Sequence, residues 1–351
     1  FSSRRRHTRY ISVTGVQTCA LPILTEAFVA DTNPNKVNLG VGVYCDDNGK
    51  VPVLGCVRKA EEKIAAAAAP HGYLPIDGLA AYDKAVQAEL FGADSDTVKG
   101  GRAVTVQALG GTGGLKIGAD FLRRINPKAK VWISDPSWEN HRALFEYAGF
   151  TVNTYPYYHE ATHGVNFDAM MATLNGLPAG DIVVLHACCH NPTGADLTPA
   201  QWERVIEVVN ARSLVPFLDI AYQGFAEGLD ADAAPVRRFA QACPVTVVSS
   251  SFSKSLSLYG ERVGALSIAT GSSEEAARVL SQVKRVIRTN YSNPPMFGGQ
   301  VVSTVLTTPE LRKQWDVELG QMRDRIKTMR RQFVEKVRAH RADFDFSFIM
   351  D

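Results

Sequence analysis

The chain has 351 residues, of which 45% are hydrophobic, and its 38 basic and 36 acidic side chains give a formal net charge of +2. A chain of this length and composition can bury a sizeable core, which we expect to divide into two domains or lobes. The balanced charge does not indicate a nucleic-acid partner, and no apolar run reaches the roughly 18 residues of a membrane span. Six scattered cysteines without a CxxC pair favour a reduced, soluble, cytoplasmic protein.

The first 22 residues differ in composition from the rest of the chain. They are rich in arginine and serine, contain no acidic residue and show no helix or strand periodicity. An organelle transit peptide and a cloning or read-assembly scar both explain such a stretch, and we favour the scar because it stops abruptly at a globular pattern. Residues 1–22 are therefore left out of the fold prediction.

The next segments alternate between extended and helical patterns. Lys36–Tyr44 alternates apolar and small residues, which predicts a strand or extended segment before a turn at 46–49. An alanine-rich helix is expected over Val57–Ala69, where Pro70 stops it.

A glycine-rich segment then lies between an expected strand, Val104–Ala108, and an expected amphipathic helix, Leu115–Arg124. A strand, a glycine-rich turn and a helix point backbone N–H groups at an anion. The glycine spacing at 110–114 matches neither a dinucleotide motif nor a P-loop. On its own it is also compatible with a turn that only allows tight packing.

From residue 131 onward, expected strands and helices follow one another. This alternation predicts an α/β fold with a mostly parallel sheet and helices on both faces. The expected strands are Val131–Asp135, Thr151–Tyr155, Asp181–His186, Leu214–Asp219, Pro244–Val248 and Leu266–Ala269. The expected helices are Trp138–Ala148, Phe167–Leu174, Pro199–Ala211, one from about Ala233, Glu274–Ile287, Gly298–Thr307 and Pro309 to about Arg338, before a last expected strand, Phe344–Met350.

Five candidate site residues end or follow five of the expected strands, Val104–Ala108 among them. Ligands of open α/β sheets bind at the carboxyl ends of the strands, so we expect the five side chains to lie close together. They are Thr112, Trp138, Asn191, Asp219 and Lys254.

Lys254 lies in the stretch SSSFSKSLSLYGERVG. A lysine at the end of a buried strand is poorly hydrated, which lowers its pKa and frees the amine as a nucleophile for carbonyl compounds. The hydroxyls of Ser251 and Ser253 and the cation of Arg262 suit a phosphate beside it. A solvated loop lysine is the alternative interpretation.

Eight motifs occur in the order of one known family, and together they are far more specific than any one alone. They are NLGVGVY, GYLPIDG, LGGTGGLK, SDPSWENH, HACCHNPTGAD, DIAYQGFAEGL, SSSFSKSLSLYGERVG and RTNYSNPP. From about Ile23 to Asp351 the chain resembles class I aminotransferases of the aspartate and aromatic amino acid subgroup, which are fold-type I pyridoxal-phosphate enzymes.

The resemblance implies a domain order. Residues 23–50 are expected to begin a small domain, 51–320 to form the large cofactor-binding domain, and 321–351 to begin the C-terminal part of the small domain. The family continues beyond this point and carries there an arginine for the substrate α-carboxylate, so we expect the small domain to be incomplete.

The resemblance also implies catalytic roles. Lys254 is expected to form the Schiff base with pyridoxal 5′-phosphate and to move the proton at the substrate Cα. Asp219 is expected to pair with the pyridine nitrogen, so that the ring can withdraw electrons, with His141 behind it. Tyr222 and Asn191 are expected to bond the 3′ oxygen of the cofactor. Asn191-Pro192 could instead be an ordinary turn, and His141 a surface residue.

Further contacts are implied for the face of the cofactor ring and for the cofactor phosphate. Trp138 is expected to stack on the ring face. The phosphate cup is expected to consist of Gly111, Thr112, Ser251 and Arg262, with Tyr73 contributed by the neighbouring subunit, which implies a homodimer with shared active sites. No metal site is predicted.

Substrate contacts are implied for Gly42, Trp138, Asn191 and Arg288, of which Arg288 matches the arginine that reaches across the dimer to dicarboxylic substrates. We therefore expect transfer of an amino group between aspartate, glutamate or an aromatic amino acid and 2-oxoglutarate by a ping-pong mechanism. Two alternatives remain at this stage. One is another fold-type I pyridoxal-phosphate enzyme, such as a lyase or decarboxylase, and the other is an inactive or weakly active fragment or cofactor-binding module.

Overall fold

The computed structural model describes residues 26–36 and 42–350. The chain divides into two compact units, one ending at Pro52 and one beginning at Val53. In the first unit, residues 26–30 are helical and residues 42–46 contain no strand. The rest of the strand predicted over Lys36–Tyr44 falls on residues 37–41, outside the described residues.

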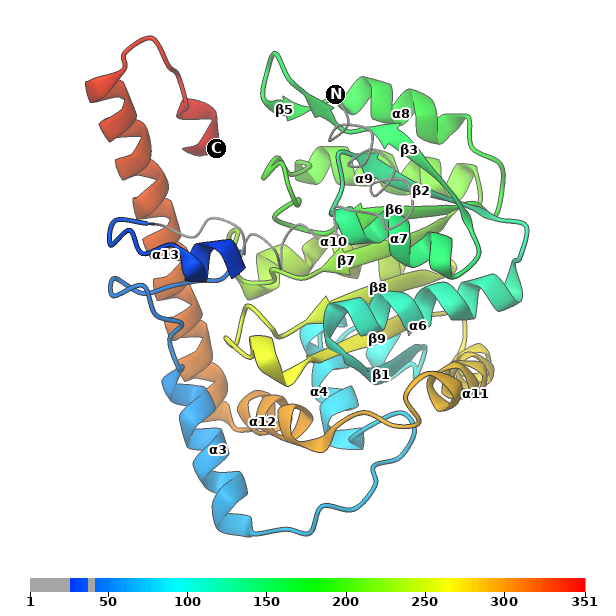
Figure 1. Cartoon of the computed structure of the whole chain (residues 1–351). Coiled ribbons are helices and arrows are strands. Elements are labelled where there is room, and N and C mark those ends of the chain that lie inside the picture. Colours follow the sequence, from blue (N-terminus) through cyan, green and yellow to red (C-terminus); the bar gives the residue numbers. More distant parts are fainter. Residues whose placement is uncertain (1–25, 37–41, 351) are drawn as a thin grey trace, which may run out of the picture. The chain divides into compact units, whose positions relative to one another are not determined.

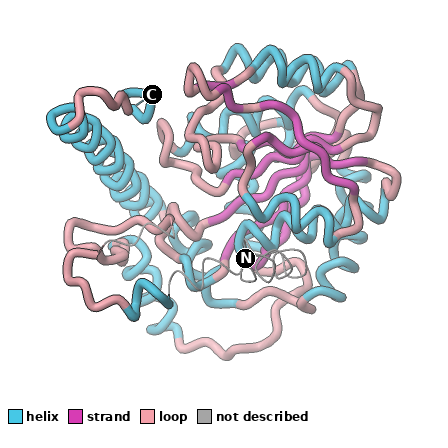
Figure 2. Tube along the Cα trace, turned by 45° about the horizontal axis from the view of Figure 1, so that its top comes forward, coloured by secondary structure: helices cyan, strands magenta, loops and turns pink. Residues whose placement is uncertain are grey.

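The second unit is built on a seven-stranded sheet in the order β1-β9-β8-β7-β6-β2-β3 (Figures 1 and 2). β9 pairs antiparallel with both neighbours, and the other pairs are parallel, so six strands run in one direction. Every residue of β6, β8 and β9 is buried, as expected for strands covered on both faces. The strands are β1 (Ala103–Leu109), β2 (Lys130–Asp135), β3 (Thr151–Pro156), β6 (Ile182–His186), β7 (Val215–Ile220), β8 (Thr246–Ser251) and β9 (Val263–Ala269).

Helices cover both faces of this sheet (Figure 1). On one face, a single apolar cluster joins the sheet to α6 (Gly110–Ile125), α7 (Glu139–Tyr147) and α11 (Ser273–Asn290). The other face carries α4 and α10, with α9 and α8 beside them. These helices are α4 (Ala80–Phe91), α8 (Phe167–Asn175), α9 (Pro199–Ala211) and α10 (Leu229–Ala242).

Three further helices pack together beside this layered body. They are α3 (Gly55–Ala67), α12 (Met296–Thr307) and α13 (Pro309–His340). The first half of α13 lies against α3, and its second half projects away from the sheet (Figures 1 and 2). α13 runs without interruption through residue 320. The domain boundaries expected at 50 and 320 stay predictions. The remaining elements are α5 (Asp96–Lys99), the hairpin β4 (Tyr158–His159) and β5 (Gly164–Val165), η1 (Tyr259–Glu261) and η2 (Ser347–Met350).

Two expected boundaries were wrong. The glycine-rich segment at 110–114 forms the first turn of α6 and not a turn before it. α10 begins at Leu229, four residues before the expected Ala233, and includes Pro235 in its interior. Proline is usual in the first turn of a helix, which explains the late prediction.

The strand expected over Phe344–Met350 was also wrong. The segment ends in the 3-10 turn η2. Just before it, the rings of Phe344 and Phe346 stack, and Phe346 meets Phe333 edge to face. A strand needs a neighbouring strand to satisfy its backbone N–H and C=O groups, and none of the described strands pairs with this segment.

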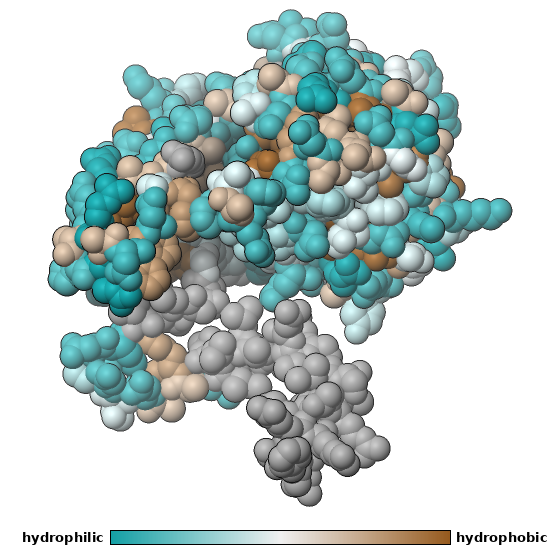
Figure 3. Space-filling view, turned by 90° about the horizontal axis from the view of Figure 1, so that it is seen from above, coloured by the Kyte–Doolittle hydropathy of each residue, from teal (hydrophilic) through white to brown (hydrophobic). Residues whose placement is uncertain are grey.

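Two properties of the described surface and helices bear on partners. None of the described helices is both long enough and apolar enough to cross a membrane. In the view of Figure 3, the described residues present a mostly hydrophilic surface on which hydrophobic side chains form small separate patches.

Candidate active site

The candidate residues gather at the carboxyl edge of the six parallel strands. Asp219 is the next-to-last residue of β7, Lys254 follows β8, and Asn191 follows β6. Thr112 and Trp138 follow β1 and β2 at the starts of α6 and α7. β1, β2, β6, β7 and β8 run in one direction, so all five residues lie at the same edge of the sheet.

At one corner of this edge, the start of α6 lies beside the segment that follows β8. Gly110 has a φ of +68°, and a Cβ added there would lie 2.7 Å from Nη2 of Arg262. The Ser249 hydroxyl donates to the carbonyl of Gly111 at 2.8 Å, which ties β8 to the helix start. Only glycine fits where a positive φ coincides with so close a neighbour. The arrangement places a helix N-terminus beside a guanidinium, and both favour an anion.

Two serine hydroxyls lie in this corner beside Arg262. The Ser251 hydroxyl accepts a hydrogen bond from the backbone N–H of Ser253 at 3.2 Å. Nη1 of Arg262 donates to the Ser253 hydroxyl at 3.4 Å and to the carbonyl of Tyr259 at 3.1 Å. These contacts orient the guanidinium toward the glycine turn.

A buried chain of hydrogen bonds holds Asp219. Its Oδ2 lies 2.9 Å from Nε2 of His141, and Nδ1 of His141 lies 2.9 Å from the hydroxyl of Ser137. His141 is fully buried and Asp219 is 5% exposed. The expectation that His141 lies behind Asp219 agrees with this geometry, whereas a surface histidine does not.

His186, at the end of β6, was missed in the sequence analysis. It is buried, neither of its ring nitrogens has a hydrogen-bond partner among the described residues, and its ring centroid lies 5.0 Å from that of His141. Burial lowers its pKa well below the usual value, and the neighbouring His141 and His190 lower it further. The ligand atoms of His141, His186 and Asp219 lie within 4.8 Å of one another, a spacing that a metal ion could bridge. The hydrogen bond between His141 and Asp219 already uses one atom of each.

His190, four residues further on, was also missed. Its ring nitrogens lie 2.9 Å from the Ser134 hydroxyl and 2.8 Å from the Thr193 hydroxyl. The ring stacks on Tyr157 with centroids 3.9 Å apart. His190 therefore fixes the loop of Asn191 to the end of β2. Both histidines end or follow β6, so the argument from strand ends that selected Asn191 could have found them.

Lys254 is half-buried, and the described residues offer its Nζ no hydrogen bond or ion pair. Nζ lies over the ring of Tyr222, 4.8 Å from its centroid. Burial lowers the pKa of the lysine, nearby Arg262 lowers it as well, and the charge of Asp219 opposes both. A lowered pKa increases the fraction of neutral, nucleophilic amine at neutral pH.

Tyr222 and the residues around it complete the centre of the site. Burial, and then the charge of Asp219, raise the pKa of Tyr222, while a hydrogen bond with Asn191 lowers it. Trp138 meets His141 edge to face, with ring centroids 5.3 Å apart. The Trp138 ring therefore borders the same space as Asp219.

Three predicted residues lie away from this centre or cannot be placed against it. Tyr73 is 97% exposed. Arg288 is exposed at the end of α11, where it donates to the hydroxyl of Ser292. Gly42 belongs to the first compact unit, and among the described residues no atom beyond its chain neighbours lies within 4 Å of a Cβ built on it.

Comparisons with known proteins agree with this geometry. Residues 34–351 match the family model described as aminotransferase class I and II. The chain is 62% identical over 326 residues to an aspartate aminotransferase of Pseudomonas aeruginosa, covering 93% of this chain and 82% of that protein. It is 50% identical over 335 residues to an aromatic-amino-acid aminotransferase of Escherichia coli, covering 94% and 84%.

A solved structure is also similar. It is an aromatic-amino-acid aminotransferase from Burkholderia pseudomallei, covalently bound to pyridoxal phosphate, with 67% sequence identity and a TM-score of 0.92 over 94% of this chain and 83% of that one.

The chain belongs to the class I and II aminotransferase family. It is an aminotransferase with the α/β fold of the fold-type I enzymes, and pyridoxal phosphate is its cofactor. The expected fold, enzyme class and cofactor are thereby confirmed.

Proposed function

We propose that this chain moves an amino group between an L-amino acid and 2-oxoglutarate in a ping-pong reaction, with Lys254 as the catalytic amine. The observation that carries the proposal is the state of Lys254. Its amine is half-buried, has no hydrogen-bond partner in the described chain and has a lowered pKa, at a sheet edge that also carries a buried carboxylate. A structural lysine in such a place would be expected to pair with a carboxylate.

The residues at this edge fit pyridoxal phosphate at both of its ends. The phosphate would lie at the start of α6, against the backbone of Gly111, the hydroxyls of Thr112 and Ser251, and Arg262. The absent Cβ of Gly110 supports this assignment, because it leaves the guanidinium 2.7 Å from where that atom would be. A dianion suits a helix N-terminus with a guanidinium beside it.

The other end of the cofactor would meet Asp219. His141 and Ser137 hold its carboxylate in one orientation, and no described group bonds Oδ1. The carboxylate would hold a proton at the ring nitrogen. The ring of Trp138 would lie on one face, and Tyr222 with Asn191 would donate hydrogen bonds to the ring oxygen.

The chemistry divides between the cofactor and the chain. When bound, pyridoxal phosphate supplies an aldehyde that reacts with amines and a ring that withdraws electrons from the substrate Cα. Lys254 would accept and return the proton at Cα, for which it must be neutral for part of the time. Its lowered pKa increases the fraction of time that the amine is neutral.

The range of substrates follows from Arg288 and from the relatives. An exposed guanidinium at a helix end can pair with the side-chain carboxylate of aspartate, glutamate or 2-oxoglutarate. The similarity to proteins named for aspartate and for aromatic amino acids supports both substrate classes. Gly42 is expected to contribute to the binding of the substrate carboxylate.

Two further expectations rest on the resemblance to the family. Tyr73, fully exposed in one chain, would bind the cofactor phosphate of a partner subunit, which requires a homodimer. The five described cysteines are free thiols, which is compatible with the cytoplasmic location that we propose.

The experiment that tests this function compares reactions with and without an amino-group acceptor. We expect the chain with pyridoxal phosphate to convert aspartate and 2-oxoglutarate into equal amounts of oxaloacetate and glutamate. Without 2-oxoglutarate, oxaloacetate should not exceed one equivalent per site. Continued turnover without an acceptor, or release of carbon dioxide or ammonia, would instead indicate a decarboxylase or lyase.

A further inference from the structure

One face of the first half of α13 lies against the two loops that carry Tyr222 and Lys254. Arg312, Trp315, Leu319 and Arg323 are spaced three, four and four residues apart, so they line one side of the helix. None of the four belongs to the motifs on which the cofactor assignment rests. They nevertheless contact residues that are close to Tyr222 and Lys254 in the chain.

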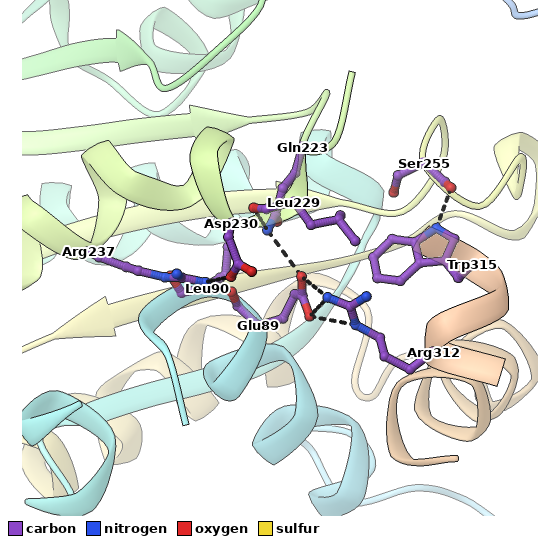
Figure 4. Close-up of polar contacts among 9 residues, drawn as sticks. All are labelled: Glu89, Leu90, Gln223, Leu229, Asp230, Arg237, Ser255, Arg312 and Trp315. Atoms are coloured by element: carbon purple, nitrogen blue, oxygen red, sulfur yellow. Dashed lines mark hydrogen bonds and ion pairs between the residues drawn. The ribbon is translucent and has the colours of Figure 1, made fainter. Parts of the chain in front are cut away.

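Trp315 contacts the chain on both sides of Lys254. Its indole Nε1 donates to the carbonyl of Ser255 at 2.7 Å (Figure 4), and its ring lies 6.4 Å from that of Phe252. Tyr82 of α4 meets Phe252 edge to face at 6.1 Å. With 1% of its surface exposed, Trp315 has little freedom to move, so the segment 252–255 is fixed at both ends.

A partly buried ion pair between Arg312 and Glu89 lies against Trp315. Nε and Nη2 of Arg312 each donate to a carboxylate oxygen of Glu89 at 3.1 Å, a two-point contact between α13 and α4 (Figure 4). The Arg312 guanidinium lies over the Trp315 ring, 4.9 Å from its centroid. Burial raises the pKa of Glu89, and Arg312 opposes that rise. A two-point guanidinium–carboxylate pair restricts both side chains in a way that a single contact does not.

The same cluster reaches the Tyr222 loop. Nε2 of Gln223 donates to the carbonyl of Leu229 at 3.0 Å and to Oε1 of Glu89 at 3.4 Å (Figure 4). Further along α13, Nη1 of Arg323 donates to the carbonyl of Gly224 at 2.8 Å. A Cβ on Gly224 would lie 2.2 Å from Cδ2 of Leu319, so the loop packs directly on the helix.

We propose that Trp315 is a positioning residue that sets the place of Lys254 relative to Tyr222, and that the Glu89–Arg312 pair holds it there. The proposal rests on the proposed role of Lys254 as the reactive amine. The contacts account for how an amine without a hydrogen bond keeps its place 4.8 Å from the centroid of the Tyr222 ring. Phe252 and Ser255, on either side of Lys254, both contact Trp315, and Gln223, the residue after Tyr222, contacts Glu89.

The test compares Trp315→Phe with Trp202→Phe. Both tryptophans are buried, but Trp202 packs on Phe239 between α9 and α10, away from the site. Phenylalanine keeps most of the packing and removes the indole N–H. We would measure amide hydrogen exchange of the cofactor-free protein by mass spectrometry. The amides of Leu256 and Ser257 report on the loop, because they donate to the carbonyls of Phe252 and Lys254.

We expect Trp315→Phe to speed exchange in peptides covering 252–258 by roughly fivefold or more, as expected for the loss of one buried hydrogen bond. Trp202→Phe should leave these peptides unchanged. A purely structural effect would instead speed exchange throughout the sheet. Because no cofactor or substrate is present, this result does not depend on whether the chain catalyses transamination.

A spectroscopic measurement addresses the amine itself. With pyridoxal phosphate bound, we expect the pH midpoint of the lysine-dependent absorption band to shift in Trp315→Phe and to stay at the wild-type value in Trp202→Phe. Unchanged loop exchange together with an unchanged midpoint in Trp315→Phe would overturn the proposal.

Glu89→Gln provides a second test in case Trp315→Phe does not fold. It keeps the side-chain size but removes the charge that Arg312 contacts at two points. We expect faster exchange in both 221–228 and 252–258, because Glu89 reaches both loops. Exchange equal to that of the wild type in both segments would overturn the proposal.

Discussion

Asp219 and His141 form a buried pair in which Oδ2 of the carboxylate lies 2.9 Å from Nε2 of the imidazole. The hydroxyl of Ser137 lies 2.9 Å from the other ring nitrogen and fixes the orientation of the ring. The strand end of β7 and the start of α7 are thereby joined at the point where the proposed cofactor ring would meet the chain.

Removing the imidazole should therefore weaken cofactor binding. His141→Phe keeps a ring in the cavity but leaves a buried carboxylate oxygen without its partner. Losing a hydrogen bond to a charged group costs about 1.5–3 kcal/mol, so the dissociation constant for pyridoxal phosphate should rise roughly tenfold to a hundredfold. The constant is measured by fluorescence titration of the cofactor-free protein. His159→Phe, at an exposed position, is the control, and equal constants in the two variants would contradict the assignment.

The phosphate corner is tested by adding a single methyl group. In Gly110→Ala the new Cβ would lie 2.7 Å from Nη2 of Arg262, and φ at this position is +68°. A non-glycine residue with such a φ costs about 1–2 kcal/mol, and the guanidinium must also move. We expect a lower melting temperature and at least a tenfold loss of affinity for pyridoxal phosphate.

Gly260→Ala is the matched control for that change. Gly260 lies in the same segment as Arg262 and does not have a positive φ, and in the described part of the chain no atom beyond its neighbours in sequence lies within 4 Å of its Cβ position. It should keep wild-type affinity. A Gly110→Ala variant that binds pyridoxal phosphate as tightly as Gly260→Ala would exclude this corner as the phosphate site.

Asp83 gives the protein a predictable dependence of stability on pH. Burial raises the pKa of this carboxyl from 3.8 to about 8, and nearby Asp77 adds to the rise. The folded state therefore holds a proton that the unfolded state releases between these two values. The free energy of unfolding should decrease as the pH rises from about 4 to about 8.

Asp83→Asn should remove this dependence. The variant should match the wild type in stability at about pH 4 and exceed it at about pH 8, as measured by urea unfolding of the cofactor-free protein. Asp316→Asn, at an exposed position on α13, should follow the wild-type profile. A stability difference between Asp83→Asn and the wild type that does not change with pH would show that the carboxyl titrates normally.

The role proposed for Arg288 predicts a selective loss. Arg288→Ala should raise KM for aspartate by roughly tenfold to a hundredfold, the effect of losing a charge-assisted hydrogen bond of about 1.5–3 kcal/mol. KM for phenylalanine should change little, because its side chain has no carboxylate. Arg285→Ala removes another exposed arginine of α11 and should leave both constants unchanged. An equal loss for both substrates in Arg288→Ala would contradict the role.

The position of the site at one sheet edge could be predicted because it does not depend on the order of the strands in the sheet. Alternating strands and helices imply a parallel sheet, and a parallel sheet brings Asp219, Asn191 and Lys254 to one edge whichever strands are neighbours. The reverse direction of β9 was not predicted. It matters for Arg262, which immediately precedes β9: because β9 runs antiparallel to β8, its start lies beside the end of β8.

Contacts that depend on packing could not be predicted. Trp315 lies 60 residues from Ser255 in the chain, and nothing in its local pattern distinguishes it from a core tryptophan. α4 was missed although Tyr82, Val86 and Leu90 recur every four residues, because Asp83 is buried with them while Ala80 and Ala81 are exposed, so the helix has no simple polar face. The strand expected at 344–350 failed for a related reason, since sequence alternation does not show whether a partner strand exists.

The most direct test of the account is the visible spectrum of the chain with pyridoxal phosphate, recorded before and after addition of aspartate. Lys254→Ala is compared with Lys128→Ala, which changes an exposed lysine. We predict a visible absorption band of the lysine-bound cofactor in the wild type and in Lys128→Ala but not in Lys254→Ala. Aspartate should bleach that band toward the spectrum of pyridoxamine phosphate. A band that persists in Lys254→Ala, or one that no amino acid changes, would contradict the assignment of Lys254 as the catalytic amine of a transaminase.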